Sequence, residues 1–280
     1  MKRYQDFDIK NLSHIKIGGV VKEYIEFESV DELKYLKECG KKFVIGKGSN
    51  ILFEDAYFDE TFFSLKRLSH IEYLGQGRVK IGAGSSLADL LKFMAQHELT
   101  GLEVLAGVPA TVGGMLYMNA GANKISIFDF VENVTILDEQ YNLVTLPKYK
   151  ISHGYRETEF KHRNVTIVEA IFRFLEVGYS FATAMGASDL KKMKQPLQYP
   201  NLGSIFKNPE SMGAWKAITE CGLRGKIVGG AQISELHSNF IINIGSAKFS
   251  DVIELISEIK FKVKEKFAIE LEEEIIIKKA

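Results

Sequence analysis

The sequence predicts an α+β fold, in which short helices and strands follow one another along 280 residues. Residues 250–267 have apolar side chains at helical spacing, and residues 86–99 show the same pattern behind a serine that can cap a helix. Residues 131–146 indicate two strands around a polar turn, and residues 165–175 alternate as a half-buried strand does. Helices packed on sheets are therefore expected.

Weaker patterns complete the order of elements before residue 100. A helix is predicted over residues 29–39, with Ser29 as its cap and Glu32 at the capping-box position. Residues 42–45 and 79–81 indicate strands, because each is a short apolar run that leads into a glycine turn.

Three later regions are less regular. Residues 101–123 hold five glycines and little periodicity, so we expect a long structured loop, of a kind that usually carries function. Residues 187–193 indicate a short helix, and residues 269–279 indicate a closing strand. Alternation along that strand would place Glu272 and Glu274 on one face.

Composition narrows the class of protein. Lys plus Arg and Asp plus Glu both number 36, so no basic excess exists for a nucleic-acid partner. No apolar run approaches the ~20 residues of a membrane span, and the first residues lack the apolar core of a signal peptide. Two cysteines without a C-x-x-C pair suit a reducing compartment, so we expect a cytoplasmic protein. No two histidines are spaced i,i+4, and we expect no metal site.

A short glycine loop follows the strand predicted at residues 42–45. It consists of Gly46, Lys47, Gly48, Ser49 and Asn50. Its glycines can turn main-chain N–H groups outward to bind pyrophosphate oxygens, and its polar side chains add donors. It lacks the ending of a Walker A loop and the third glycine of the Rossmann fingerprint. A plain tight turn is the alternative.

The region of residues 106–122 is rich in small residues. Such a surface lets a flat ligand approach the backbone, although close packing of backbone against backbone explains it equally well. The candidates for ligand contact are Gly107, Pro109, Thr111, Gly113, Gly114, Asn119 and Gly121.

Residues 199–209 are the segment to which we give most weight. Gly203 lets the chain approach a ligand next to Ser204, while Lys207 and Asn208 offer a charge and an amide for a phosphate or a base edge. Taken alone, a serine in a polar loop is usually a turn or cap residue.

Other single residues admit two interpretations each. Arg156 can polarise a carboxylate or an enolate, although a surface salt bridge is the commoner fate of an arginine. A tail carboxylate, Glu272 or Glu274, belongs either to a site or to a solvated edge. For His237 we favour a core hydrogen-bonder.

Four stretches in this order resemble the UDP-N-acetylenolpyruvoylglucosamine reductase family. They are Gly-Lys-Gly-Ser-Asn-Ile-Leu at 46–52, residues 101–121 ending in Met-Asn-Ala-Gly, Gly-Ser-Ile-Phe-Lys-Asn-Pro at 203–209, and His-Ser-Asn-Phe-Ile-Ile-Asn at 237–243. The resemblance runs over almost the whole chain, and the joint order is more specific than any one stretch.

The resemblance implies an FAD-binding half of the vanillyl-alcohol-oxidase type with two subdomains, and a smaller α+β substrate-binding domain. On this sequence the subdomains would be residues 1–64 and 65–195, and the substrate domain residues 196–273. Residues 274–280 would return to the FAD half.

The resemblance also implies a reaction in peptidoglycan precursor synthesis. NADPH reduces the FAD, and UDP-N-acetylglucosamine enolpyruvate then binds in the place that NADP⁺ leaves. A hydride goes to C3 of the enolpyruvyl group and a proton goes to C2, which gives UDP-N-acetylmuramate. No nucleic acid or membrane takes part, and we expect a monomer.

Residue roles follow from the same resemblance. Ser204 matches the proton donor, Arg156 the arginine that steadies the enolate, and Glu274 the tail carboxylate. Lys194 and Asn208 resemble contacts to the nucleotide sugar. The glycine loop and the small-residue region would contact FAD.

The sequence departs from the family pattern at several places. Ala110 stands where Pro-Gly is usual, and Ile276 stands in a tail that usually carries Arg and Gly. The chain has no inserted segment between Arg156 and Lys194 from which a tyrosine loop could form. It therefore resembles the shorter subtype, which has a more open active site. Another FAD oxidoreductase of the same fold, or a non-catalytic nucleotide-binding module, is the alternative.

Overall fold

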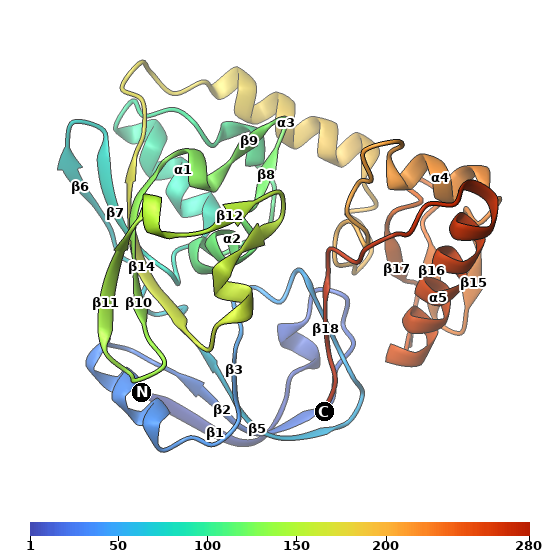
Figure 1. Ribbon diagram of the computed structural model, residues 1–280, viewed down its shortest axis with the longest axis horizontal. Coiled ribbons are helices and arrows are strands. Elements are labelled where there is room, and N and C mark those ends of the chain that lie inside the picture. Colours follow the sequence, from blue (N-terminus) through green and yellow to red (C-terminus); the bar gives the residue numbers. More distant parts are fainter. The chain divides into compact units, whose positions relative to one another are not determined.

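The computed structural model describes residues 1–280 as two compact units, each built from helices and sheets (Figure 1). Unit 1 comprises Met1–Gln5, Glu23–Lys47 and Glu60–Leu190, and unit 2 comprises Asp6–Lys22, Gly48–Asp59 and Lys191–Ala280. The predicted α+β class is confirmed. The predicted division into three domains stays a prediction.

The secondary structure consists mainly of short elements. The strands are β1 (Lys2–Asp8), β2 (Val20–Glu26), β3 (Lys42–Val44), β4 (Ile51–Phe53), β5 (Tyr57–Ser64), β6 (Ile71–Gly75), β7 (Arg78–Gly82), β8 (Gly121–Ala122), β9 (Ile125–Ser126), β10 (Val131–Leu137), β11 (Leu143–Pro147), β12 (His153–Gly154), β13 (Glu157–Thr158), β14 (Thr166–Arg173), β15 (Ile227–Val228), β16 (Ala231–Ile233), β17 (Ile241–Asn243) and β18 (Ile276–Lys278). The α-helices are α1 (Leu87–Gln96), α2 (Val112–Met118), α3 (Phe181–Lys194), α4 (Ala214–Glu220) and α5 (Phe249–Phe267). The 3-10 helices are η1 (Lys10–Leu12), η2 (Asp31–Lys37), η3 (Glu103–Leu105), η4 (Ile127–Asp129), η5 (Lys148–Lys150) and η6 (Glu159–His162).

Unit 1 is organised around an antiparallel five-stranded sheet in the order β11-β10-β14-β7-β6 (Figure 1). Helix α2 packs against β7 and β14. Helix α1 adds its apolar side to the same buried core. A four-stranded sheet has the order β1-β2-β5-β3, and its strands β1, β2 and β5 continue along the chain from one unit into the other.

Unit 2 has its own core, formed by helices α4 and α5 and the antiparallel sheet β15-β16-β17. The last strand, β18, pairs in parallel with β4, so that Ile276 lies opposite Ile51. The end of the chain is thereby joined to a segment that precedes it by more than two hundred residues. No helix in either unit is long and apolar enough to cross a membrane.

Two predicted helices are confirmed in detail. Ser86 caps α1 by accepting a hydrogen bond from the main-chain N–H of Asp89, and the predicted apolar stripe of α1 is buried. In α5 the buried side chains are Val252, Leu255, Ile256, Ile259 and Val263, which is the predicted face. Burying one such side chain fully contributes roughly 1.5–3 kcal/mol, so this stripe is sufficient to hold the helix on its sheet.

The predicted capping of the first helix is wrong. Residues 31–37 form a 3-10 helix, and neither Ser29 nor any other side chain caps it. Glu32 instead accepts hydrogen bonds from the main-chain N–H of Glu28, at 2.8 Å, and from the charged N-terminus of Met1, at 2.5 Å. One oxygen of the carboxylate therefore reaches back to Glu28 instead of Ser29, and the other pairs with the N-terminus.

The region of residues 101–123 is not a continuous loop, because it contains η3, α2 and β8. Glycines at two of the first three positions of α2 conceal the helix in the sequence. Helix α3 is longer than predicted and begins at Phe181. The closing strand is shorter than predicted, since only Ile276–Lys278 belong to β18, and the tail glutamates precede it.

His237 does not form the expected core hydrogen bond through its Nδ1 atom, which is buried without a partner. Its ring lies beside those of Trp215 and Phe240, at centroid distances of 6.5 and 4.8 Å. Burial lowers the pKa of His237 below its ordinary value of 6.5. The imidazole is thus a neutral packing group.

We expect His237→Gln to weaken the acid sensitivity of folding. Below about pH 6.5 the unfolded chain binds a proton that the folded chain resists, so stability falls as the pH falls through that value. Unfolding by urea, followed through the fluorescence of Trp215, the single tryptophan, measures this at pH 7 and pH 5.5. Between pH 7 and pH 5.5 the free energy of unfolding of the variant should fall by up to about 1 kcal/mol less than that of the wild type. An equal fall in both proteins would contradict the assignment of His237 as a neutral group.

Candidate active site

The glycine loop at residues 46–50 follows β3 and presents unused main-chain donors. None of its five N–H groups donates a hydrogen bond within the protein. Gly48 has φ +61° and lies so close to the main chain of Leu12 that a Cβ would come within 2.0 Å of the Leu12 carbonyl oxygen. A glycine is therefore required there, and the free N–H groups suit an anionic ligand.

Helix α2 begins in close contact with the end of β7. Thr111 caps the helix by accepting a hydrogen bond from the N–H of Gly114, at 3.3 Å. The N–H of Gly113 donates to the carbonyl of Ala83, at 2.9 Å, and a Cβ on Gly113 would lie 2.9 Å from the Ala83 Cβ. A Cβ on Gly46 would lie 2.6 Å from the Thr111 Oγ1. Close packing against Thr111 and Ala83 thus accounts for Gly46 and Gly113.

The other candidates of this region lie on both sides of α2. Gly107 has φ +86° and is exposed, as is Pro109. Asn119 ends the helix in a left-handed conformation, at φ 42°, and is only 5% exposed. Its Nδ2 donates to the carbonyl of Gly154, at 2.7 Å, whereas its Oδ1 is buried without a partner. An orphaned acceptor of this kind indicates a place where a ligand donor completes the network.

Arg156 stands in the two-residue turn between β12 and β13, with φ 55°. A left-handed conformation is uncommon for an arginine and costs roughly 1–3 kcal/mol, so the surroundings must hold it. Its Nη2 donates to the carbonyl of Gly121, at 2.7 Å, and its own carbonyl accepts from Lys161 Nζ, at 2.6 Å. Together with the bond from Asn119 to Gly154, these contacts join the Arg156 turn to the end of α2.

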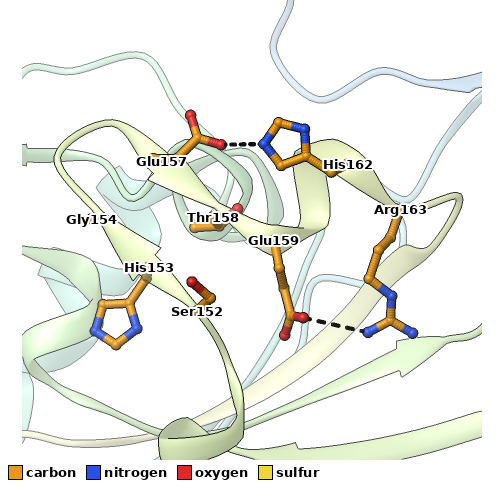
Figure 2. Close-up of a pocket in the computed structure, with 8 residues that line it drawn as sticks. All are labelled: Ser152, His153, Gly154, Glu157, Thr158, Glu159, His162 and Arg163. Atoms are coloured by element: carbon orange, nitrogen blue, oxygen red, sulfur yellow. Dashed lines mark hydrogen bonds and ion pairs between the residues drawn. The ribbon is translucent and has the colours of Figure 1, made fainter.

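A pocket of about 450 Å³ lies beside this hairpin, as Figure 2 shows. Its lining residues are Ser152, His153, Gly154, Glu157, Thr158, Glu159, His162 and Arg163. His162 Nε2 lies 2.7 Å from Glu157 Oε1, and Arg163 Nη1 lies 3.8 Å from Glu159 Oε2. The closer partner of Arg163 is Glu139, outside the pocket, at 2.9 and 3.0 Å, and the Oε1 of Glu159 is buried without a partner.

The ionisation of the pocket carboxylates follows from these pairs. Burial opposes the charge on Glu157, but the bonds from His162 and Lys161 outweigh it and lower the pKa of that carboxyl. Glu157 is therefore charged at neutral pH. Lys161, which lies within bonding reach of Glu157, connects this pocket to the turn of Arg156 by donating to the Arg156 carbonyl.

In unit 2, Ser204 lies in an irregular segment between Gly203, at φ +77°, and the buried Ile205. Its hydroxyl makes no hydrogen bond within the protein. The carbonyl of Ile205 accepts a hydrogen bond from the N–H of Glu274, at 2.7 Å, and the N–H of Lys207 donates to the carbonyl of Glu272, at 2.9 Å. The chain tail thus pairs with the Ser204 segment, although neither is part of a named strand.

The three tail acids have different partners. Glu272 forms an ion pair with Lys207, and Glu273 forms one with Lys260 at 2.8 Å. Glu274 is held through its main chain, since its carbonyl accepts from Asn50 Nδ2 at 3.1 Å. The structure therefore brings Asn50, Ser204 and Glu274 into one part of unit 2. The Glu272 side chain, 70% exposed, is held at the solvent side by Lys207, and the choice between Glu272 and Glu274 as the site carboxylate stays a prediction.

The two predicted nucleotide-sugar contacts are both exposed. Lys194 is the last residue of α3, and Asn208 follows the Ser204 segment. The Oδ1 of Asn208 accepts a hydrogen bond from the N–H of Ala214, at the start of α4, at 3.1 Å. Its Nδ2 makes no bond within the protein and stays available as a donor.

Comparison with known proteins identifies the family. An FAD binding domain family matches residues 24–146, and the C-terminal domain of UDP-N-acetylenolpyruvoylglucosamine reductase matches residues 195–278. The UDP-N-acetylenolpyruvoylglucosamine reductase of Fusobacterium nucleatum is 41% identical over 280 residues, which are 99% of each chain. The chain belongs to the UDP-N-acetylenolpyruvoylglucosamine reductase family.

Other members agree over similar lengths. The Thermotoga maritima reductase is 39% identical over 270 residues and 94% of each chain. The crystal structure of the Thermus caldophilus enzyme matches with a TM-score of 0.84 at 29% identity, over 99% of this chain and 98% of that one. The predicted family and the predicted FAD cofactor are confirmed. The role of each site residue stays a prediction.

The main-chain donors of the 46–50 loop and the buried acceptor of Asn119 each fit an FAD group. Free N–H groups in the 46–50 loop suit a pyrophosphate, and the buried Oδ1 of Asn119 lacks a donor that a flavin ring could supply.

Three side-chain bonds have no signal in the sequence. Asn239 Oδ1 accepts from the N–H of Phe206, Asn50 Nδ2 donates to the carbonyl of Glu274, and the Thr158 hydroxyl donates to the carbonyl of Tyr117 at 2.7 Å. Their partners are distant in sequence, so no local pattern indicates them.

We expect two adjacent glycines of α2 to respond differently to alanine. Gly113→Ala should lower the free energy of unfolding by about 1–3 kcal/mol, because its Cβ would lie 2.9 Å from the Ala83 Cβ. Gly114→Ala should change it by less than about 1 kcal/mol, because the helix preference of alanine offsets a tight 3.3 Å contact with the Thr111 Oγ1. Urea unfolding followed by circular dichroism checks this, and an equal loss from both substitutions would contradict the packing described.

Proposed function

We propose that the chain catalyses the NADPH-dependent reduction of UDP-N-acetylglucosamine enolpyruvate to UDP-N-acetylmuramate, a step of peptidoglycan precursor synthesis. Support comes from the family, from the FAD binding domain, and above all from one structural observation. The N–H of Glu274 binds the carbonyl of Ile205, which links the two proposed catalytic segments of unit 2.

The redox chemistry would come from FAD. When bound, FAD would supply a hydride equivalent for C3 of the enolpyruvyl double bond, with NADPH as the source of the electrons. The electron pair of that bond is then left at C2, next to the substrate carboxylate, and a proton at C2 completes the balance. The protein must hold the substrate, supply the proton and stabilise the developing negative charge.

We assign the proton to the Ser204 hydroxyl, which is not engaged by any other group of the protein. A serine is a weak acid, but a strongly basic carbanion accepts a proton from a weak acid that is correctly positioned. Arg156 provides a permanent positive charge for the enolate-like carboxylate, in a conformation that its hairpin imposes. One preorganised donor of this kind contributes roughly 3–4 kcal/mol. Glu274 organises the proton network around the substrate.

The remaining roles complete the proposal. We assign the nucleotide-sugar contacts to Lys194 and to the free Nδ2 of Asn208, within a substrate-binding domain of residues 196–273. Contacts to FAD are assigned to the loop of residues 46–50 and to the small residues around α2. The protein acts as a monomer in the cytoplasm, and the absence of a tyrosine loop leaves its site open to solvent.

Ser204→Ala separates the two half-reactions. Bleaching of the flavin by NADPH should keep its wild-type rate, because no proton from Ser204 is needed for it. Reoxidation of the reduced enzyme by UDP-N-acetylglucosamine enolpyruvate should slow by about 100-fold or more, in the range that general acid catalysis supplies. Stopped-flow absorbance near 450 nm follows both steps anaerobically. Equal slowing of both steps would assign Ser204 to the cofactor site or to the fold instead.

A further inference from the structure

The buried Asn239 forms a two-point clamp on the segment that follows Ser204. Its Oδ1 accepts a hydrogen bond from the N–H of Phe206, at 3.0 Å, and its Nδ2 donates to the carbonyl of Phe206, at 2.9 Å. Its own carbonyl accepts the N–H of Ile205, at 2.8 Å. Asn239 is 3% exposed, and both clamped residues are fully buried. The side-chain amide thus imitates a neighbouring strand across one residue.

The residue before Ser204 is held as well, because the N–H of Gly203 donates to Asn201 Oδ1, at 2.9 Å. After Ser204, the carbonyl of Ile205 also accepts a hydrogen bond from the N–H of Glu274, at 2.7 Å. The main chain is therefore fixed immediately before and immediately after Ser204. Ser204 is the one residue between these anchors, and its hydroxyl makes no hydrogen bond within the protein.

We propose that Asn239 is a positioning residue for the proton transfer, which holds the main chain at Ile205 and Phe206 so that the Ser204 hydroxyl meets the substrate in one orientation. This inference rests on the proposed function. It assigns a task to the His-Ser-Asn-Phe stretch at residues 237–240, whose histidine is a neutral packing group. It also explains why the two segments occur together. The Ser204 segment carries the proton donor, and residues 237–240 hold the Ser204 segment in place.

If Asn239 only stabilised the fold, any buried asparagine with similar bonds should have the same effect on the reaction when it is replaced. Asn243 provides the matched control. Asn243 lies in the same stretch of chain, is 9% exposed, and also makes side-chain bonds to distant and local main chain. Its Nδ2 donates to the carbonyl of Ile15, at 2.9 Å, and its Oδ1 accepts from Gly245, at 2.9 Å. None of these bonds reaches residues 203–208.

The test compares Asn239→Ala with Asn243→Ala in the FAD-loaded enzyme. Both variants should be less stable than the wild type, as judged by urea unfolding. Only Asn239→Ala should slow reoxidation of the reduced flavin by UDP-N-acetylglucosamine enolpyruvate, by about 10- to 100-fold, because a small displacement of a reacting group has an effect of this size. Flavin bleaching by NADPH should keep its rate in both variants.

Asn239→Asp supplies a second readout that does not depend on loss of the side chain. A carboxylate retains the acceptor for the Phe206 N–H but repels the Phe206 carbonyl, whereas a protonated carboxyl accepts and donates as the amide does. Burial raises the pKa of such a carboxyl. The reoxidation rate of this variant, relative to the wild type at each pH, should therefore rise as the pH is lowered from about 8 to about 6.

The outcomes separate the inference from the function on which it rests. If the reduced wild-type enzyme is not reoxidised by the enol ether, the proposed function fails. If the wild type reacts but Asn239→Ala reoxidises at the wild-type rate, the positioning role is overturned. Equal slowing in Asn239→Ala and Asn243→Ala, or a flat relative pH profile for Asn239→Asp, would also overturn it.

Discussion

The hydrogen bonds around Ile205 and Phe206 are the constraint on which unit 2 depends. Both residues are fully buried, yet they belong to no helix or strand, so their main-chain groups must find partners outside regular structure. Asn239 and the N–H of Glu274 supply them. Leaving one such buried group unpaired costs about 1–3 kcal/mol, which is a large part of the stability of a typical domain.

The same physical device recurs in both units. A buried or half-buried asparagine amide donates to a main-chain carbonyl far away in sequence, and so joins segments that no ladder connects. Asn119 reaches Gly154, Asn50 reaches Glu274, Asn239 reaches Phe206 and Asn243 reaches Ile15, with separations of 35, 224, 33 and 228 residues. Each bond ends at or near a proposed site segment, with the exception of the one from Asn243. Irregular main-chain segments are thus held by an asparagine on one side, and the side that faces away from the asparagine stays open to ligands.

Much of the fold could be predicted from local patterns. The apolar stripe of α5 and the cap of α1 are dictated by residues three or four positions apart, and both were predicted correctly. Helix α2 could not be predicted, because Gly113 has an intrinsic cost in a helix that only its contact with Ala83 explains. The capping role of Glu32 failed for a similar reason, since the N-terminus of the chain competes for its carboxylate.

The candidate site shows the same limit. Ser204, Arg156 and Glu274 could be proposed because the resemblance to the family implies a role for each. The residues that hold these segments in place could not be predicted, because Asn239 and Asn50 bind main-chain groups that only the folded chain brings near them. The tail illustrates the difference: alternation predicted a strand with Glu272 and Glu274 on one face, whereas the tail pairs with residues 205–207 before β18 begins. Sequence motifs thus indicate the candidate site residues, whereas hydrogen bonds between distant segments determine how those residues are oriented.

Amide hydrogen exchange tests the central claim most directly, because it reports whether the loop that carries Ser204 is held as firmly as regular structure. We expect the N–H groups of Ile205, Phe206 and Glu274 to exchange as slowly as those of β17, which belongs to the same core. In Asn239→Ala the protection of Ile205 and Phe206 should fall while that of β17 is retained. Rapid exchange of Ile205 and Phe206 in the wild type, at the rate of an exposed loop, would contradict the account.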